Sequence, residues 1–143
     1  MSWIKPSVAN TLYPFGFTNL TGVLGSPYTN TAIVGVPVLN LTSATLILTN
    51  GDLANGFLIY TNIGTNLNSH NTLTNLDAGT KIGPTNHLVI AINTNNGVVT
   101  VTFQPTGAKT NTAAHGAVLQ NQTNAAGYFL GTNQSGTFTL DPP

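Results

Sequence analysis

Charge is what this sequence lacks most. Only 3 of its 143 residues are lysines and only 3 are aspartates, while arginine and glutamate are absent. Charged residues make up 4% of the chain, against about 25% in an average soluble domain. Nucleic-acid binding depends on clustered Lys and Arg side chains that neutralise phosphates, so the scattered lysines exclude a nucleic acid as the partner. Zero net charge also removes the repulsion that keeps small proteins apart, and we therefore expect association.

Reactive chemistry is equally scarce. Cysteine is absent, which excludes a disulfide framework and a thiolate zinc site. The three histidines, His70, His87 and His115, lie in polar surroundings, and their spacing to Ser and Asp favours no catalytic triad. Asp52 follows Asn50-Gly51 and Asp77 precedes Ala78-Gly79, positions where turns favour aspartate. A weak calcium site at Asp52 is the one metal site left open. The sequence predicts no catalytic residue, no cofactor and no enzyme activity.

Long apolar runs are missing as well. No run approaches the roughly 18 residues of a membrane-spanning helix, and we therefore expect no membrane partner. Residues 1–10 lack the apolar stretch of a secretory signal peptide. The sequence thus predicts synthesis in a cytosol without export by that route, and a mature secreted form with an added Met stays open as the alternative.

Asparagine and threonine take the place of the missing charges. The chain holds 19 Asn and 24 Thr, about 30% of its residues. Threonine favours strands and asparagine favours turns, whereas the absent Glu and Arg favour helices. From residue 32 onward short apolar runs alternate with Gly, Asn and Pro, and no segment shows a helical period. Residues 32–143 are therefore predicted to form one all-β domain, an antiparallel β-sandwich or jelly roll of about seven to nine short strands.

The expected strands follow from the apolar runs between turn residues. They lie at 34–41, at a sheet edge because of Pro37, and at 45–49, 57–61, 88–92, 99–103, 117–120, 127–130 and 136–140. Residues 62–80 are expected to form a long loop that has room for one short strand. Asn96-Gly97 is typical of a two-residue type I′ hairpin turn. Such a turn would place Ile92 opposite Val101 and Ile90 opposite Phe103.

Residues 1–31 differ from the rest. They contain five of the eleven aromatic residues: Trp3, Tyr13, Phe15, Phe17 and Tyr28. Proline and glycine interrupt every candidate element there, so we expect an extended N-terminal arm. Its aromatic side chains either fold back on to the core of the same chain or dock on a neighbouring subunit. For the second alternative, the predicted partner-binding residues are Trp3, Tyr13, Phe15 and Phe17.

A charge-poor, cysteine-free β domain rich in Asn, Thr and Gly, with an aromatic arm before it, resembles phage virion structural proteins. Within that class it is most similar in composition and strand pattern to capsid decoration (cement) proteins and to fibre or spike domains. The resemblance covers the whole chain in composition and pattern, and it rests on no diagnostic motif. It implies a β-sandwich or jelly roll, often trimeric, on the exterior of a virion. The implied partners are the major capsid protein or other virion subunits, which the protein would clamp together.

Two alternatives from other classes stay open. A subunit of an extracellular β filament would share the low charge and the strand pattern, but it should carry a leader peptide. A carbohydrate-binding β-sandwich module should place two or three aromatic residues on one flat strand face. In this sequence the aromatic residues instead gather in the arm.

Overall fold

The computed structural model describes residues 2–9, 15–20, 22–30, 38–39, 41, 43–66, 72–75 and 88–143. Across these ranges it contains ten β-strands, one 3-10 turn, η1 (Gln120–Gln122), and no α-helix. The prediction of an all-β protein is therefore confirmed. Residues 34–37, which carry most of the first expected strand, lie outside the described residues.

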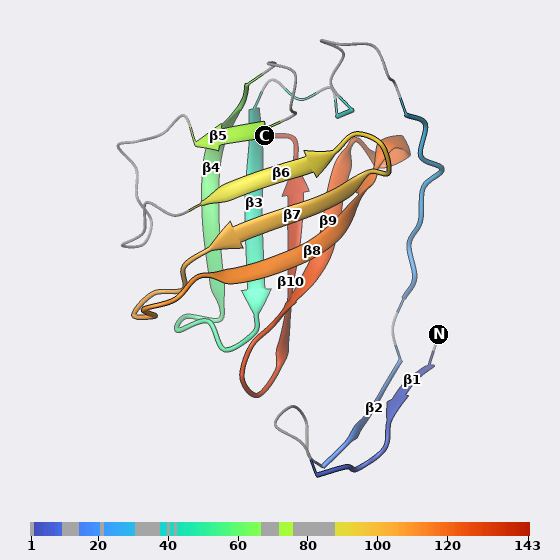
Figure 1. Cartoon of the computed structure of the whole chain (residues 1–143), viewed down its shortest axis with the longest axis vertical. Helices are drawn as coiled ribbons and strands as arrows, with labels where there is room; N and C mark the ends of the chain where they lie inside the picture. Colours follow the sequence, from blue (N-terminus) through green and yellow to red (C-terminus); the bar gives the residue numbers. More distant parts are fainter. Residues whose placement is uncertain are drawn as a thin grey trace.

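Eight strands form a closed antiparallel barrel, and each pairs with the next strand along the chain. They are β3 (Ser43–Asn50), β4 (Phe57–Asn66), β5 (Thr72–Asn75), β6 (Val89–Asn93), β7 (Val98–Phe103), β8 (Thr112–Leu119), β9 (Asn124–Leu130) and β10 (Ser135–Asp141). Pairing of β10 with β3 closes the meander. The closure is narrowest at β5, which pairs with β4 only along residues 63–66 and with β6 only at Thr72 and Leu73. In Figure 1, β6, β7 and β8 cross in front of β3 and β4, so the closed sheet has two layers. The expected sandwich-like antiparallel fold is confirmed in this form.

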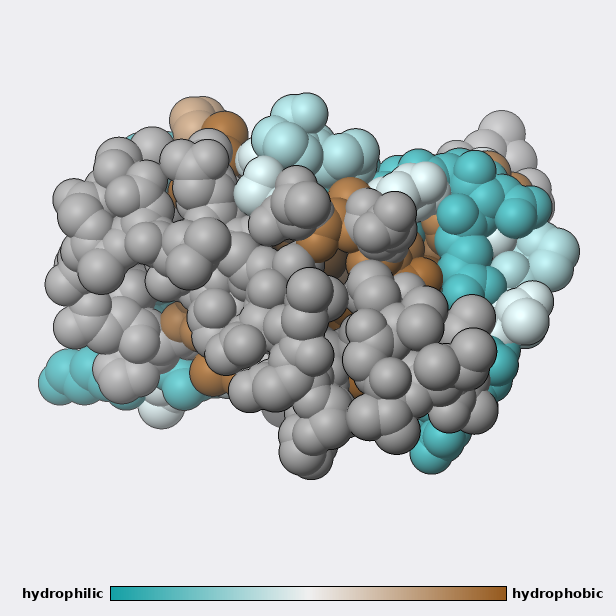
Figure 2. All heavy atoms as spheres, turned by 90° about the horizontal axis from the view of Figure 1, so that it is seen from above, coloured by the Kyte–Doolittle hydropathy of each residue, from teal (hydrophilic) through white to brown (hydrophobic). Residues whose placement is uncertain are grey.

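Alternation of side chains along the strands builds the core. Every second residue of β6, β7 and β10 is buried, as expected for a sheet with one apolar face. The largest fully buried side chains are Phe103, Phe129, Phe138, Leu46, Leu48, Ile90, Leu140, Val99 and Val101. The rings of Phe103 and Phe129 meet edge to face with their centroids 5.1 Å apart, which is a favourable geometry for aromatic pairs. Viewed from above, Figure 2 shows hydrophobic residues toward the middle of the molecule and hydrophilic ones at its margins.

One glycine is needed to fit this aromatic core. Gly127 of β9 pairs with Phe138 of β10. A Cβ at Gly127 would lie 2.4 Å from the Phe138 ring and 2.2 Å from the His115 carbonyl oxygen. The missing side chain of Gly127 therefore leaves the space that the Phe138 ring occupies.

The hairpin of residues 88–103 is confirmed, but its predicted register is wrong by two residues. The observed pairs are Ile92 with Val99 and Ile90 with Val101. Because the shift is an even number of residues, the same side chains face the interior, and all four are buried.

A longer turn causes the shift. The N–H of Gly97 donates to the carbonyl oxygen of Asn93 at 2.8 Å, and four residues separate β6 from β7. Gly97 has a φ of 71°, but Asn96 is not among the residues with positive φ, and a type I′ turn needs positive φ at both. The Oδ1 atom of Asn93 also accepts the N–H of Asn95 at 2.9 Å. This local side-chain hydrogen bond favours the wider turn.

Two other expected boundaries are wrong. Strand β4 continues to Asn66, into the stretch expected to be a loop, whereas the short strand β5 at residues 72–75 agrees with the one short strand allowed there. Strand β8 begins at Thr112, five residues before the expected start at Ala117. Its Ala, Gly and His residues have modest strand preference, but β8 pairs with β7 on one side and β9 on the other. Tertiary pairing overrides propensity here.

Candidate functional site

The N-terminal arm contains a hairpin that the sequence did not predict. Strands β1 (Ser2–Lys5) and β2 (Phe17–Leu20) pair antiparallel in a separate two-stranded sheet. The residues that were expected to break the arm, such as Pro6 and Gly16, lie between the two strands and do not interrupt them. Figure 1 shows this hairpin standing away from the barrel, joined to it by an extended segment.

The arm exposes much apolar surface. Its large exposed hydrophobic residues are Ile4, Val8, Phe15, Val23 and Leu24, and Phe15 is 91% exposed. They are half of the large hydrophobic side chains exposed in the described part of the chain. Of the other predicted partner-binding residues, Trp3 lies on β1 and Phe17 on β2. Tyr13 lies outside the described residues.

Residues 26–29, here called the latch, tie the arm to one end of the barrel. The hydroxyl of Tyr28 donates to the carbonyl oxygen of Thr94 in the β6–β7 turn. The Tyr28 ring packs against the core cluster and covers Gly97, where a Cβ would lie 2.6 Å from the ring. Thr29 exchanges two hydrogen bonds with the Gln120 side chain, at 2.7 and 3.0 Å. The latch thus fixes where the arm leaves the barrel.

Burial at the latch changes the acidity of its tyrosine. Desolvation raises the pKa of Tyr28 above its ordinary value, because the phenolate would lose water on the barrel surface. Tyr28 therefore folds back on to the core of its own chain, which is the first of the two alternatives for the arm. Phe15, in contrast, contacts solvent over most of its surface. The arm residues have two different environments.

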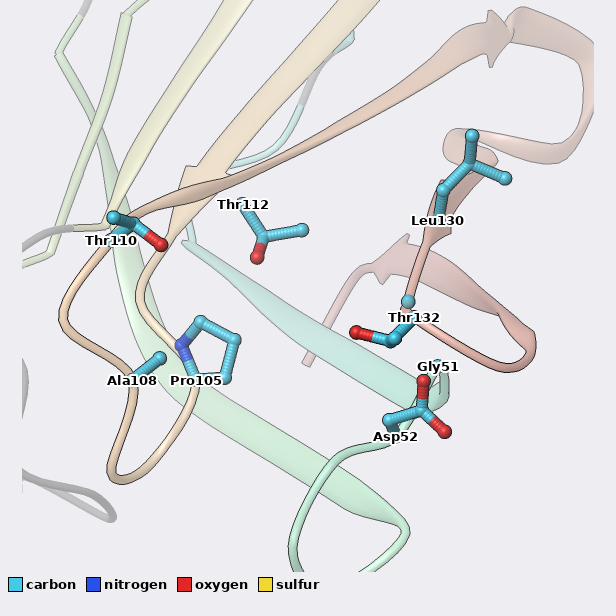
Figure 3. Close-up of a pocket in the computed structure, with 9 residues that line it drawn as sticks. Gly51, Asp52, Pro105, Ala108, Thr110, Thr112, Leu130 and Thr132 are labelled. Carbon is cyan, nitrogen blue, oxygen red and sulfur yellow. The ribbon is translucent and has the colours of Figure 1, made fainter. Parts of the chain in front are cut away.

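A hollow of about 520 Å³ lies at the opposite end of the barrel, where three loops meet. The loops are 51–56 between β3 and β4, 104–111 between β7 and β8, and 131–134 between β9 and β10. The lining residues are Gly51, Asp52, Pro105, Ala108, Thr110, Thr112, Leu130, Gly131 and Thr132. Figure 3 shows the hydroxyls of Thr112 and Thr132 directed into the space between these loops.

Unusual backbone geometry positions the one carboxylate of the hollow. Asn50, Gly51 and Asp52 have φ values of 62°, 62° and 63°, and such a left-handed run is costly for non-glycine residues. The Oδ2 atom of Asp52 accepts the N–H of Asn133 at 2.7 Å, which joins the β3–β4 loop to the β9–β10 turn. The carboxylate is therefore held in place by a backbone donor from a neighbouring loop.

A second hollow of about 400 Å³ continues from the first along the outer face of β8 and β9. It is lined by Asn111, Thr112, Ala113, His115, Tyr128, Phe129 and Leu130. Thr112 and Leu130 line both hollows, and together we call the two hollows the end groove. His115 pairs directly with Tyr128 across the strands, and Tyr128 is 54% exposed.

The sequence analysis did not predict this groove. His115 and Asp52 were considered separately, and the structure places them at opposite ends of the end groove. The groove threonines, Thr110, Thr112 and Thr132, could not be singled out from the sequence because the chain contains 24 threonines. His70, Asp77 and His87 lie outside the described residues. Within the described ranges, no cluster of three or more His, Cys, Asp or Glu side chains is arranged to hold a metal ion.

No protein-family model, no curated protein and no solved structure matches this chain. In the described part of the chain no helix is long and apolar enough to cross a membrane. The functional argument therefore rests on the residues of the arm, the latch and the end groove.

Proposed function

We propose that this protein is a non-enzymatic structural component of a virus particle that decorates the capsid exterior and clamps neighbouring subunits with its arm. The observation that supports the proposal is the apolar hairpin held away from a closed barrel. Most strands of the barrel pair with a neighbour on both sides, and the arm carries half of the large exposed hydrophobic side chains in the described part of the chain, so the arm is the element suited to joining subunits. The capsid shell and other copies of this chain, most plausibly in a trimer, are the proposed partners.

Burial of the arm would drive attachment. Apolar surface contributes about 25 cal/mol per Å² removed from water, and the cost of ordering the arm lowers this gain. The latch and the β1–β2 hairpin already order the described parts of the arm, which reduces that cost. No acidic residue and only one basic residue, Lys5, occur in residues 1–31. Attachment should therefore depend little on salt concentration.

The first test is where the native protein sediments in a lysate of its source. Co-sedimentation with a capsid protein at a fixed ratio in virus-sized particles is the expected result. Sedimentation in particles without a capsid protein would instead indicate a filament subunit. Recovery as a small monomer in the supernatant would overturn the assembly proposal.

A deletion variant then tests the arm itself. Removing residues 1–20 should abolish co-sedimentation, while circular dichroism and thermal unfolding of the barrel stay close to those of the full chain. The matched control is Val98→Ala, which trims an exposed apolar side chain on β7. Undiminished attachment after the deletion would show that the arm is not the clamp.

A further inference from the structure

The end groove combines three kinds of contact in a fixed order. An exposed aromatic ring, Tyr128, lies at one end beside His115. Thr112 and Leu130 line the middle, where the two hollows join. Asp52, Thr110 and Thr132 line the other end. Ligand sites typically combine apolar and aromatic surface with a few convergent polar groups, and the groove has this composition.

The polar groups of the groove are organised before any ligand arrives. Asp52 is held by the Asn133 N–H at 2.7 Å. The 104–111 loop is braced by a hydrogen bond from the Gln104 amide to the Ala108 carbonyl oxygen at 2.7 Å. The N–H of Gly131 donates to the carbonyl oxygen of Gln134 at 3.0 Å in the third loop. Preorganisation of this kind lowers the entropic cost of binding.

The backbone conformation fixes the position of Asp52. Only three non-glycine residues in the described part of the chain have positive φ, and two of them, Asn50 and Asp52, flank Gly51. Asn and Asp are residue types that adopt this left-handed conformation. Here it sets the carboxylate of Asp52 against the β9–β10 turn, at the rim of the hollow.

The size and charge of the groove restrict its ligand. Tyr128 on β9 and Gly131, directly after its end, are three residues apart, about 10 Å along an extended chain, which suits a disaccharide. Among the described residues that line the groove, Asp52 is the only Asp, Glu, Lys or Arg. Its carboxylate accepts hydrogen bonds and disfavours an anionic ligand. An aromatic face for ring C–H groups, hydroxyls and one strong acceptor are together suited to a neutral sugar.

We infer that the end groove binds a neutral disaccharide unit, either free or at the end of a longer glycan. In this complex a sugar ring stacks on Tyr128, and the next ring donates a hydroxyl hydrogen bond to Asp52. This inference goes beyond the proposed clamp and does not depend on it. The latch contacts the β6–β7 turn, whereas the β3–β4, β7–β8 and β9–β10 loops that line the groove lie at the other end of the barrel; Figure 1 shows these turns and loops at opposite ends. Deleting residues 1–20 should therefore leave sugar binding unchanged.

The test is a titration of the ¹⁵N-labelled full chain, followed by NMR, with maltose, cellobiose, lactose and N,N′-diacetylchitobiose. At least one of these sugars should give saturable shifts confined to the loops at 51–56, 104–112 and 128–134. Sialyllactose adds a carboxylate to lactose and should bind no better than lactose. Binding to the end of a longer glycan is tested by co-sedimentation of the protein with insoluble cellulose and chitin. Co-sedimentation would indicate that the ligand is part of a polysaccharide, and binding of the soluble disaccharides alone would indicate a free sugar.

Two variants test the assigned contacts. Asp52→Asn keeps a residue that tolerates positive φ. Its amide oxygen can still accept the Asn133 N–H, while the charge and the second acceptor oxygen, which would receive the sugar hydroxyl, are lost. Tyr128→Ala removes the exposed ring from the outer face. Each should weaken binding about tenfold, the effect of losing one charge-assisted hydrogen bond or a comparable contact. Val98→Ala, which trims another exposed side chain, should leave affinity within about twofold, as is usual for a surface change away from the site.

Three results would overturn the inference. The first is the absence of saturable shifts with all four sugars at about 10 mM, which is above the Kd of even a millimolar complex. The second is a set of shifts outside the groove. The third is full affinity in both variants, whose amide spectra report whether each remains folded.

Discussion

The barrel and the N-terminal arm are built from the same charge-poor composition but use their apolar residues in opposite ways. In the barrel, every second side chain turns inward, and Phe103, Phe129 and Phe138 are almost completely buried. In the arm, Phe15 is 91% exposed. The barrel closes its hydrogen bonds through β10 and β3, whereas the arm hairpin has only two strands, which is marginal as an independent unit.

The difference shows how a chain with few charges separates folding from association. Burial of apolar side chains in the barrel core stabilises the folded chain. Exposed apolar surface in the arm stabilises nothing within the chain and is available to a partner. The latch at Tyr28 is the boundary between the arm and the barrel, since the Tyr28 ring packs against the barrel core. Mutations on the two sides of the latch should therefore have different readouts.

Truncation of a core ring should give the largest effect. Phe129→Ala removes a ring that packs against Phe103 and is 2% exposed. The expected loss is about 3–5 kcal/mol of unfolding free energy, a large share of the stability of a small domain. Urea denaturation followed by circular dichroism measures it. Phe15→Ala is the matched control, and an equal loss in both variants would contradict the contrast between barrel and arm.

Adding a single methyl group in the barrel should be the next most damaging change. Gly127→Ala places a Cβ 2.2 Å from the backbone oxygen of His115, which cannot move without disturbing the β8–β9 pairing. Overpacking of this kind costs about 1–3 kcal/mol. Gly25→Ala is the control in the arm, where no atom lies within 4 Å of the added group. Thermal unfolding of both variants should show a lowered Tm for the barrel change alone.

Loss of one hydroxyl should loosen the boundary between the two regions. Tyr28→Phe keeps the ring but removes the hydrogen bond to Thr94, and a typical net loss is about 1 kcal/mol. The loss should appear as faster hydrogen exchange of the Thr29 amide, which is bonded to Gln120. Amides of β7 should exchange as before. Tyr128→Phe, at an exposed ring, is the control, and slow exchange at Thr29 in both variants would show that the hydroxyl is not needed.

Alkaline pH should also weaken the latch, gradually and by less than the loss of the Tyr28 hydroxyl. Burial raises the pKa of Tyr28 above 10.0 in the folded chain, so folding favours the protonated phenol. The stabilisation is complete below about pH 10 and is lost as pH rises through the raised pKa. The difference in Thr29 protection between the native chain and Tyr28→Phe should therefore shrink above that pH. A difference that persists when Tyr28 is ionised, as judged by ultraviolet absorbance, would contradict the proposed role of its proton.

Patterning in the sequence was sufficient to predict the fold class and the inward faces of its strands. The placement of Ile90 and Ile92 at alternate positions predicted the correct face of β6, because parity survives a two-residue error in register. It could not predict the register itself, since the Asn93 side chain stabilises a wider turn than Asn96-Gly97 suggested. Strand β8 was missed in part because its pairing partners, and not its residues, make it a strand.

The end groove was beyond sequence reasoning for a different reason. Asp52 and Tyr128 are 76 positions apart in the sequence, and only closure of the barrel brings their loops to one end. No local pattern records that approach. The arm was easier, because its aromatic residues were visible as a group, although its hairpin was hidden by the long separation of β1 and β2.

The smallest effect on stability should come from the arm ring, and it is the most informative about association. Phe15→Ala removes a side chain that is 91% exposed, so the unfolding free energy should change by no more than about 0.5 kcal/mol. Its attachment to capsid-sized particles should nevertheless fall, because the ring would be buried only in the assembled state. Co-sedimentation at equal protein concentration measures this, with Val98→Ala as the exposed barrel control. Equal attachment of the two variants would show that Phe15 is not part of the clamp. A loss of attachment confined to Phe15→Ala, with unchanged unfolding free energy, would show that the arm ring serves association and not folding.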